Sequence, residues 1–304
     1  MADIETGGQA TKEAPYCTAY HPDSSSPLFP LPAGACDTHA HICGPEKAFP
    51  YDPARIYTPP DALLPAYEHM LGVLGVERMV LVQPSVYGND NRVMLGAMRE
   101  ASVPARGVAV VPMDIEQAEL EELHEAGVRG VRFNLVDVKD PSAGLPVAEI
   151  TAFAGRIAPM GWHVELLIHV DDYPEFGTMF LNFPTEIVVG HIGYFRPGCG
   201  LDHPGFQGLV NLAESGLCWV KFTGPYRISA EEFPYGDVDR FAEALVARAP
   251  HRLLWGSDWP HVMMKKTMPD DGPLADVFAR WVPETAIRRQ ILVDNPARLY
   301  QFEK

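Results

Sequence analysis

Basic residues are scarce in this 304-residue chain, which has 24 Lys and Arg against 40 Asp and Glu and a formal charge of -16 at pH 7. Such an excess of negative charge repels the phosphates of nucleic acids and the headgroups of anionic membranes. We therefore expect neither a nucleic acid nor a membrane surface among its partners.

Long apolar runs and cysteines are also few. No stretch of about 18 apolar residues occurs, so no membrane-spanning helix is predicted. The first residues lack the basic and apolar segments of a secretory signal. The five cysteines, at positions 17, 36, 43, 199 and 218, form no CxxC pair and no regular framework. An odd, scattered set suits a reducing compartment, so the sequence predicts a cytoplasmic protein.

The composition is that of a folded chain, since 47% of the residues are hydrophobic and 21% are charged. Residues 1–33 differ, because a polar stretch passes there into a segment rich in Pro and Ser that cannot sustain helix or sheet hydrogen bonds. We expect an extended N-terminal arm over residues 1–33 and a single domain over residues 34–304.

Short apolar runs rich in β-branched residues alternate with segments of helical periodicity along the domain, which is typical of a parallel sheet built from βα units. Eight such runs predict strands near residues 35–41, 78–84, 106–112, 128–134, 162–170, 186–192, 217–224 and 251–259. The clearest helical segments are 61–75, 91–101, 116–127 and 238–249, and two or three further helices are expected over 273–302.

Eight strands, each followed by a helix over roughly 250 residues, are what a closed (β/α)8 barrel requires. The sequence therefore predicts a TIM-like barrel. A doubly wound open sheet is the alternative, but the first predicted strand lacks the GxGxxG turn that is typical of that fold.

The first predicted strand carries the sequence DTHAH, with Asp37, His39 and His41. The two-residue period of a strand points both imidazoles to the same side, which can be the barrel interior. Two neutral imidazole nitrogens at this spacing suit a metal such as Zn²⁺. Taken alone the pattern is weak, because two structural histidines beside a turn would look the same.

Polar residues also close three later strands: His169 the fifth, His191 the sixth and Asp258 the eighth. In a barrel of this type the functional site lies at the carboxyl ends of the strands, so these side chains are expected to converge. We predict a divalent metal site made of His39, His41, His169 and Asp258, with His191 nearby. A core histidine bonded to a carbonyl is the alternative for each imidazole, which would leave a non-catalytic metal- or ligand-binding barrel.

The strings DTHAH, IVVGHIG and LLWGSDWPH, together with their spacing between Gly34 and Tyr300, resemble the amidohydrolase superfamily and its amidohydrolase 2 branch. Within that branch the chain is similar to the 2-pyrone-4,6-dicarboxylate lactonases, the 4-sulfomuconolactone hydrolases and the galactarolactone isomerases. The resemblance implies that Asp258 acts as general base or metal ligand. It also implies that His39 and His41 ligate metal or polarise the scissile carbonyl.

Two arginines at predicted strand ends stand out in so acidic a chain. Arg132 and Arg227 can each make a two-pronged contact with a carboxylate, so an anionic substrate is expected. Pairing with helix carboxylates is the alternative. Ser85, Tyr87 and Asn91, in the loop after the second strand, are further candidates for donating hydrogen bonds to the same ligand, although NDN is also an ordinary turn and cap.

The segment 135–138 and the residues Leu167 and His169 depart from the dicarboxylate lactonase pattern that the resemblance implies. Residues 135–138 (LVDV) replace a basic pair, Leu167 replaces a tyrosine, and His169 stands where that lactonase has an acidic residue and works without metal. These changes weaken the case for that one substrate. They also make metal dependence more plausible here.

The sequence thus predicts a hydrolase that opens a carboxylated or sulfonated lactone, such as a muconolactone or a 2-pyrone dicarboxylate, in aromatic-compound catabolism. A metal-bound or Asp258-activated water would attack the lactone carbonyl, with Asp258, His191, His39 and His41 as catalytic residues. The expected cofactor is a divalent metal, zinc in the first place, and the alternative is an enzyme without metal. The sequence is compatible with a homo-oligomer and does not fix the number of subunits. A lactone isomerase and a metal-dependent decarboxylase of the same superfamily are the alternatives.

Overall fold

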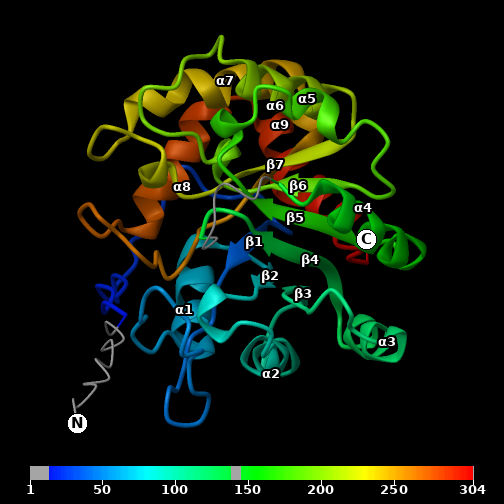
Figure 1. Cartoon of the computed structure of the whole chain (residues 1–304). Helices are drawn as coiled ribbons and strands as arrows, with labels where there is room; N and C mark the ends of the chain where they lie inside the picture. The colour runs from blue at the N-terminus through cyan, green and yellow to red at the C-terminus, as the bar shows by residue number, and fades with distance from the viewer. Residues whose placement is uncertain (1–13, 138–144, 304) are drawn as a thin grey trace, which may run out of the picture.

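The computed structural model describes residues 14–137 and 145–303 and contains one sheet of eight parallel strands in sequential order (Figure 1). The strands are β1 Cys36–Ala40, β2 Arg78–Val82, β3 Ala105–Ala109, β4 Val128–Asn134, β5 His163–Leu167, β6 Ile187–Val189, β7 Cys218–Phe222 and β8 Leu253–Trp255. All eight predicted strands are present, and their order confirms the TIM-like barrel over the doubly wound sheet.

Helices follow the strands and form the outer layer of the barrel (Figure 1). They are α1 Leu64–Leu74, α2 Arg92–Glu100, α3 Gln117–Glu125, α4 Val147–Ile157, α5 Phe176–Met179, α6 Pro204–Glu214, α7 Asp239–Arg248, α8 Asp271–Trp281, α9 Thr285–Arg289 and α10 Asn295–Leu299. Local chemistry sets several ends: Pro65 and Pro204 occupy first-turn positions, and Gly75 ends α1 in the left-handed region. None of these helices is both long and apolar enough to cross a membrane.

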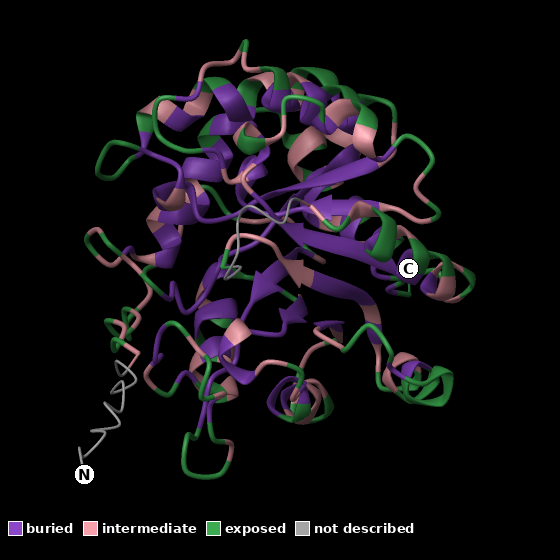
Figure 2. Ribbon diagram, in the orientation of Figure 1, coloured by how far each residue is buried: buried purple, intermediate pink, exposed green. Residues whose placement is uncertain are grey.

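The strands are buried almost throughout, whereas the outer faces of the helices are exposed (Figure 2). Inside the barrel a small apolar cluster takes residues from six strands, namely Cys36, Val80, Val82, Val108, Val188, Trp219 and Leu254. The C-terminal residues Leu299, Tyr300 and Phe302 pack against this cluster. The C-terminal segment therefore closes one end of the barrel and leaves the carboxyl ends of the strands for the site.

The barrel closes between β1 and β8 through an irregular seam. A single parallel bridge joins Ala40 to Trp259, and the backbone N–H of Asp258 donates to the His39 carbonyl at 2.8 Å. The Thr38 hydroxyl donates to the Trp255 carbonyl at 2.7 Å. A Cβ on Gly256 would lie 2.7 Å from the His39 nitrogen, so only glycine allows the two strands this close.

Residues 14–33 contain no helix and no strand beyond a bridge from Tyr16 to Thr58. The segment runs to α8, where Ser24 bonds to Asp271 and Ser25 bonds to Asp270. Further along, the backbone N–H groups of Leu28 and Phe29 donate to Asp276. The rest of the predicted arm, residues 1–13, lies outside the described residues, so the arm over 1–33 stays a prediction.

Helix α6 packs against α5 through two glycines, which yields a stability prediction. A Cβ on Gly208 would lie 2.4 Å from the Gly177 nitrogen, whereas a Cβ on Gly155 in α4 meets nothing within 4 Å. We expect Gly208→Ala to lower the free energy of unfolding by about 1–3 kcal/mol through overpacking. The matched variant Gly155→Ala should raise it by up to about 1 kcal/mol. Urea denaturation of both variants tests this, and equal shifts of the two midpoints would contradict it.

Candidate active site

Two histidines and one carboxylate meet where β1 and β8 end. His39 lies on β1, His41 directly follows it, and Asp258 lies three residues beyond β8, all three fully or almost fully buried. One ligand atom from each residue lies within 4.8 Å of the other two. The His39 Nε2 atom and the Asp258 Oδ1 atom are 3.8 Å apart. The seam that closes the barrel therefore also assembles this group.

Burial keeps both imidazoles neutral near pH 7. Burial, with the Arg132 charge second, lowers the pKa of His41 to about 4. Burial and the ammonium of Lys221 hold the pKa of His39 well below its usual range. The Nδ1 atom of His41 lies 2.7 Å from the Val82 carbonyl oxygen, so it carries the proton. That bond leaves the Nε2 lone pair of His41 free.

Asp258 adopts a left-handed backbone conformation with φ of 66°, which is uncommon for a residue other than glycine. Its Oδ2 atom accepts hydrogen bonds from Arg227 Nε at 2.6 Å and from the Tyr226 hydroxyl at 2.7 Å. Its Oδ1 atom has no hydrogen-bond partner in the described part of the chain. Burial alone would raise the pKa of this carboxyl, but the Arg227 guanidinium holds it well below the usual range, so Asp258 is ionised.

His191 adjoins the same group from the end of β6. Its Nδ1 atom lies 2.8 Å from the Thr223 hydroxyl and 4.0 Å from Asp258 Oδ2, and its ring centroid lies 5.3 Å from that of His39. Burial lowers the pKa of His191 to about 3, so this imidazole is neutral as well. The structure thus brings together His39, His41, His191 and Asp258, as the sequence predicted.

Beside His39 lies a buried ion pair that the sequence motifs did not predict. Lys221 on β7 and Glu165 on β5 lie 2.6 Å apart, and the Lys221 ammonium also donates to the Thr38 carbonyl at 2.8 Å. The Nδ1 atom of His39 lies 3.3 Å from both Lys221 Nζ and Glu165 Oε1. The available signal was a charged residue in the middle of each of two apolar strands, CWVKF and HVELL.

A pocket opens above this group, and it contains several of the predicted substrate-binding residues. Its lining comprises His41, Tyr57, Ser85, Arg132, Asn134, Val136, Asp137, Leu167, His191, Tyr194, Arg227, Asp258, Val262 and Met263. Arg132 donates one bond, at 3.3 Å, to the Gln83 carbonyl, and its Nε has no partner among the described residues. Leu167, Val262 and Met263 make one part of the wall apolar. Val138, the last residue of the segment 135–138 that differs from the dicarboxylate lactonase pattern, lies outside the described residues.

Three predicted residues lie elsewhere. Strand β5 ends at Leu167, and His169 lies beyond it, with Nδ1 2.5 Å from the Tyr194 carbonyl oxygen and outside the three-residue ligand group. The Tyr87 hydroxyl accepts a bond from the Gly44 N–H at 2.7 Å and does not line the pocket. The Asn91 side chain bonds to the backbone N–H and carbonyl of Val110. All three side chains hydrogen-bond to the backbone, and their contacts with a metal or substrate stay predictions.

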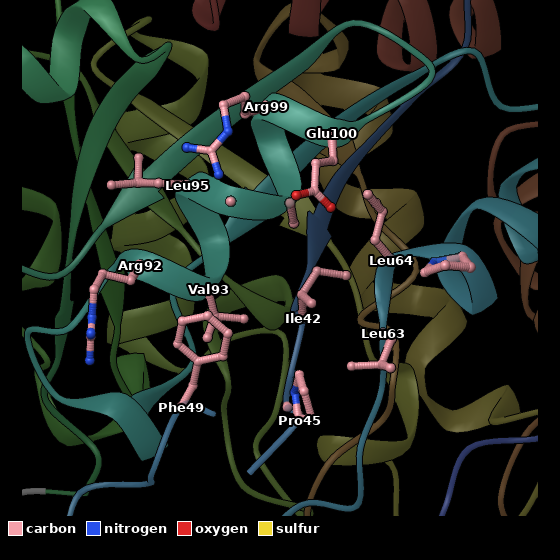
Figure 3. Close-up of a pocket in the computed structure, with 14 residues that line it drawn as sticks. Ile42, Pro45, Phe49, Leu63, Leu64, Arg92, Val93, Leu95, Arg99 and Glu100 are labelled. Atoms are coloured by element: carbon pink, nitrogen blue, oxygen red, sulfur yellow. The ribbon is translucent and has the colours of Figure 1, made fainter. Parts of the chain in front are cut away.

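A larger hollow of about 570 Å³ lies on the outer face, between the start of α1 and helix α2 (Figure 3). Its lining is mostly apolar, with Ile42, Phe49 and Leu95 among the contributing side chains, and Arg92 and Arg99 at the edge (Figure 3). It contains none of the predicted catalytic residues. The barrel pocket, although narrower, is therefore the candidate active site.

The family model described as amidohydrolase (Amidohydro_2) matches residues 36–302, which is nearly the whole chain. The chain belongs to the amidohydrolase family. This assignment confirms the resemblance drawn from DTHAH, IVVGHIG and LLWGSDWPH. It also accounts for a site at the carboxyl ends of the strands.

Curated relatives and solved structures extend this assignment. This amidohydrolase is 41% identical over 294 residues to a 2-pyrone-4,6-dicarboxylate hydrolase of Comamonas testosteroni, covering 94% of this chain and 96% of the relative. It is 38% identical over 288 residues to a 4-sulfomuconolactone hydrolase of Rhizobium radiobacter, with the same coverages of 94% and 96%. A crystal structure of an Acinetobacter baumannii protein with citric acid bound has a TM-score of 0.78 and 27% identity, covering 88% of this chain and all of that one.

The donor set fits a divalent metal. His39 Nε2 and Asp258 Oδ1 are buried without a hydrogen-bond partner among the described residues, and the Nε2 lone pair of His41 is free. Two neutral imidazoles and one carboxylate are ligands that Zn²⁺ accepts. An open fourth position in such a set is typical of catalytic sites.

The Lys221–Glu165 pair generates a second stability prediction. We expect Lys221→Met to lower the free energy of unfolding by about 3–5 kcal/mol, because Glu165 would remain buried without its partner. The double variant Lys221→Met/Glu165→Leu should recover most of that loss, since no unpaired charge remains. Chemical denaturation of both variants measures the difference. A double variant as unstable as the single one would show that the charge pair is not the cause.

Proposed function

We propose that this amidohydrolase hydrolyses a lactone that carries a carboxylate or a sulfonate, in the cytoplasm and in the breakdown of aromatic compounds. The observation that carries the proposal is an ionised carboxylate, Asp258, whose Oδ1 atom points free beside two neutral imidazoles in a pocket that also contains Arg132. The relatives named as hydrolases of a 2-pyrone dicarboxylate and of a sulfomuconolactone support a ring ester with an anionic group as substrate.

Arg132 anchors the anionic group in this proposal. It is buried and lines the pocket, and in the described structure its guanidinium makes only one bond to protein, at 3.3 Å. Arg227 also lines the pocket, but it donates to Asp258 Oδ2 and to the Val262 carbonyl. Its main role is therefore to keep Asp258 ionised. Ser85, which faces the same space, adds a hydroxyl to the anion-binding side.

The chain's own residues support attack by water. Asp258 Oδ1 accepts a hydrogen bond from the water and takes its proton as the water oxygen bonds to the carbonyl carbon. The bond between the carbonyl carbon and the ring oxygen then breaks, and the proton passes to the ring oxygen that leaves. The product is an open-chain acid that has gained one water molecule.

His191 stabilises the negative charge that develops on the carbonyl oxygen. Thr223 Oγ1 accepts the His191 backbone N–H at 3.2 Å, so its own hydroxyl proton can be donated to His191 Nδ1 at 2.8 Å. The imidazole proton then lies on Nε2. A preorganised N–H donor in a buried pocket is an effective oxyanion partner.

A divalent ion bound by His39, His41 and Asp258 would supply Lewis acidity and lower the pKa of water at this position. Zinc is the ion we propose, because the donors are two imidazoles and a carboxylate. His169 is left out of this set because it does not belong to the group of three ligand atoms that lie within 4.8 Å of one another.

Heavy-oxygen labelling of a substrate panel tests the reaction. We expect carboxylated or sulfonated lactones to be opened with one oxygen-18 from solvent in the acid product, and neutral lactones to react poorly. Asp258→Asn should lower kcat by about 100- to 10,000-fold, because the amide cannot take the proton. Mass spectrometry of products gives the readout. Product without solvent oxygen would indicate an isomerase, and release of carbon dioxide would indicate a decarboxylase.

Metal removal tests the cofactor separately. Elemental analysis of the purified protein should find about one divalent ion per chain, zinc for the most part, and a chelator should abolish turnover until zinc is restored. His41→Ala should lower the bound metal, because one of three protein ligands is lost. Full activity in metal-free protein would refute the metal and leave the lactonase assignment standing.

A further inference from the structure

A chain of hydrogen bonds leads from Asp258 away from the pocket. The Tyr226 hydroxyl lies 2.7 Å from Asp258 Oδ2 and 2.8 Å from His261 Nδ1. On the other side of that ring, His261 Nε2 lies 3.1 Å from Asp271 Oδ1. Tyr226, His261 and Asp271 are all buried, at 6%, 0% and 2% exposure. Three polar side chains, Tyr226, His261 and Asp271, thus connect the candidate base to the first turn of α8.

The donors in this chain can be assigned by counting protons. Asp258 is ionised beside Arg227 and can only accept, so the single Tyr226 proton goes to its Oδ2 atom. The Tyr226 oxygen must then accept from His261, which places a proton on Nδ1. A second proton lies between His261 Nε2 and Asp271 Oδ1, because two lone pairs would otherwise face each other at 3.1 Å. The bonds from His261 Nδ1 to Tyr226 and from Tyr226 to Asp258 therefore both point toward Asp258.

The series of hydrogen bonds continues from Asp271 to the N-terminal segment. The Ser24 hydroxyl donates to Asp271 Oδ2 at 3.1 Å, so Asp271 is held from one side by residue 24 and from the other by His261. Ser25, the next residue, bonds instead to Asp270, the N-cap of α8, whose described side-chain hydrogen bonds go to Ser25 and Gly272 and not to His261. Ser24 thus belongs to the series of hydrogen bonds that leads to Asp258, whereas its neighbour Ser25 does not, which makes Ser25 a matched control.

We propose that His261 is a positioning residue for the proposed hydrolysis: through Tyr226 it fixes Asp258 Oδ2, so that Oδ1 alone faces the reacting water. Arg227 Nε occupies Oδ2 from a second direction. Two donors on one oxygen define the plane of the carboxylate, whereas one donor would allow it to rotate. The inference rests on the proposed function for its kinetic consequence only, since the bonds exist without substrate.

Paired substitutions at His261 test the role. We expect His261→Phe to lower kcat by about 10- to 100-fold with KM within about twofold, because the carboxylate is misdirected while the substrate anchor remains. His261→Asn places an amide N–H near the position of Nδ1 and should restore most of the activity. Equal kcat values for the two variants, at either level, would overturn the proposal.

A second pair covers the case in which His261→Phe does not fold. Tyr226→Phe removes the hydroxyl that bonds to Asp258, and Tyr235→Phe removes the hydroxyl of a buried neighbour whose ring centroid lies 6.2 Å away. Only Tyr226→Phe should lower kcat, by about 10-fold or more. Ser24→Ala should lower kcat more than Ser25→Ala. A Tyr226→Phe variant as active as Tyr235→Phe would show that the hydrogen bonds from His261 through Tyr226 do not position Asp258.

Nitrogen NMR of histidine-labelled protein tests the bonds without any substrate. We expect a protonated Nδ1 on His261, assigned by its loss in His261→Asn, and a change of that signal in Tyr226→Phe but not in Tyr235→Phe. An unprotonated Nδ1 would refute the positioning chain even if lactones are hydrolysed. Conversely, the expected NMR result in a protein that hydrolyses no lactone would refute the proposed function and support the chain.

Discussion

The closure of the barrel between its first and last strands is the constraint on which the site depends. Backbone bonds from Asp258 to the His39 carbonyl and from His41 to the Trp259 carbonyl join the two strand ends at 2.8 Å each. The same bonds that close the fold therefore set the distance between the carboxylate and the imidazoles. Asp37 strengthens the seam by accepting the Ser257 N–H at 2.9 Å. Geometry that serves stability thus also preorganises the chemistry.

Charge is distributed unevenly between the surface and the interior. The chain has a formal charge of -16, yet Arg132 and Arg227 line the pocket and Lys221 is buried beside His39. Glu165 and Asp258 balance two of these cations, and Arg132 is the one without a carboxylate partner among the described residues. An anion that enters the pocket meets this remaining positive charge in a buried environment, where it is weakly screened.

The fold and the centre of the site could be predicted because buried parallel strands form near-continuous apolar runs, which makes a polar residue at their ends conspicuous. His39, His41, His191 and Asp258 were found in this way. Lys221 and Glu165 were missed because they lie within the strands, where pairing cannot be seen from composition. His169, predicted as a fourth metal ligand, lies two residues beyond the end of β5 and outside the three-residue ligand group, so its role as a ligand stays a prediction.

The low pKa of Asp258 determines how much of the activation of water this carboxylate can supply and how much other groups must supply. A carboxylate held ionised by Arg227 is a weak base, so it does not by itself account for the whole activation of water. It also releases a proton readily, which suits return of that proton to the leaving ring oxygen. The remaining activation then comes from groups that act on the water or on the carbonyl. The three free ligand atoms of His39, His41 and Asp258, and the Nε2–H of His191, are placed for those two tasks.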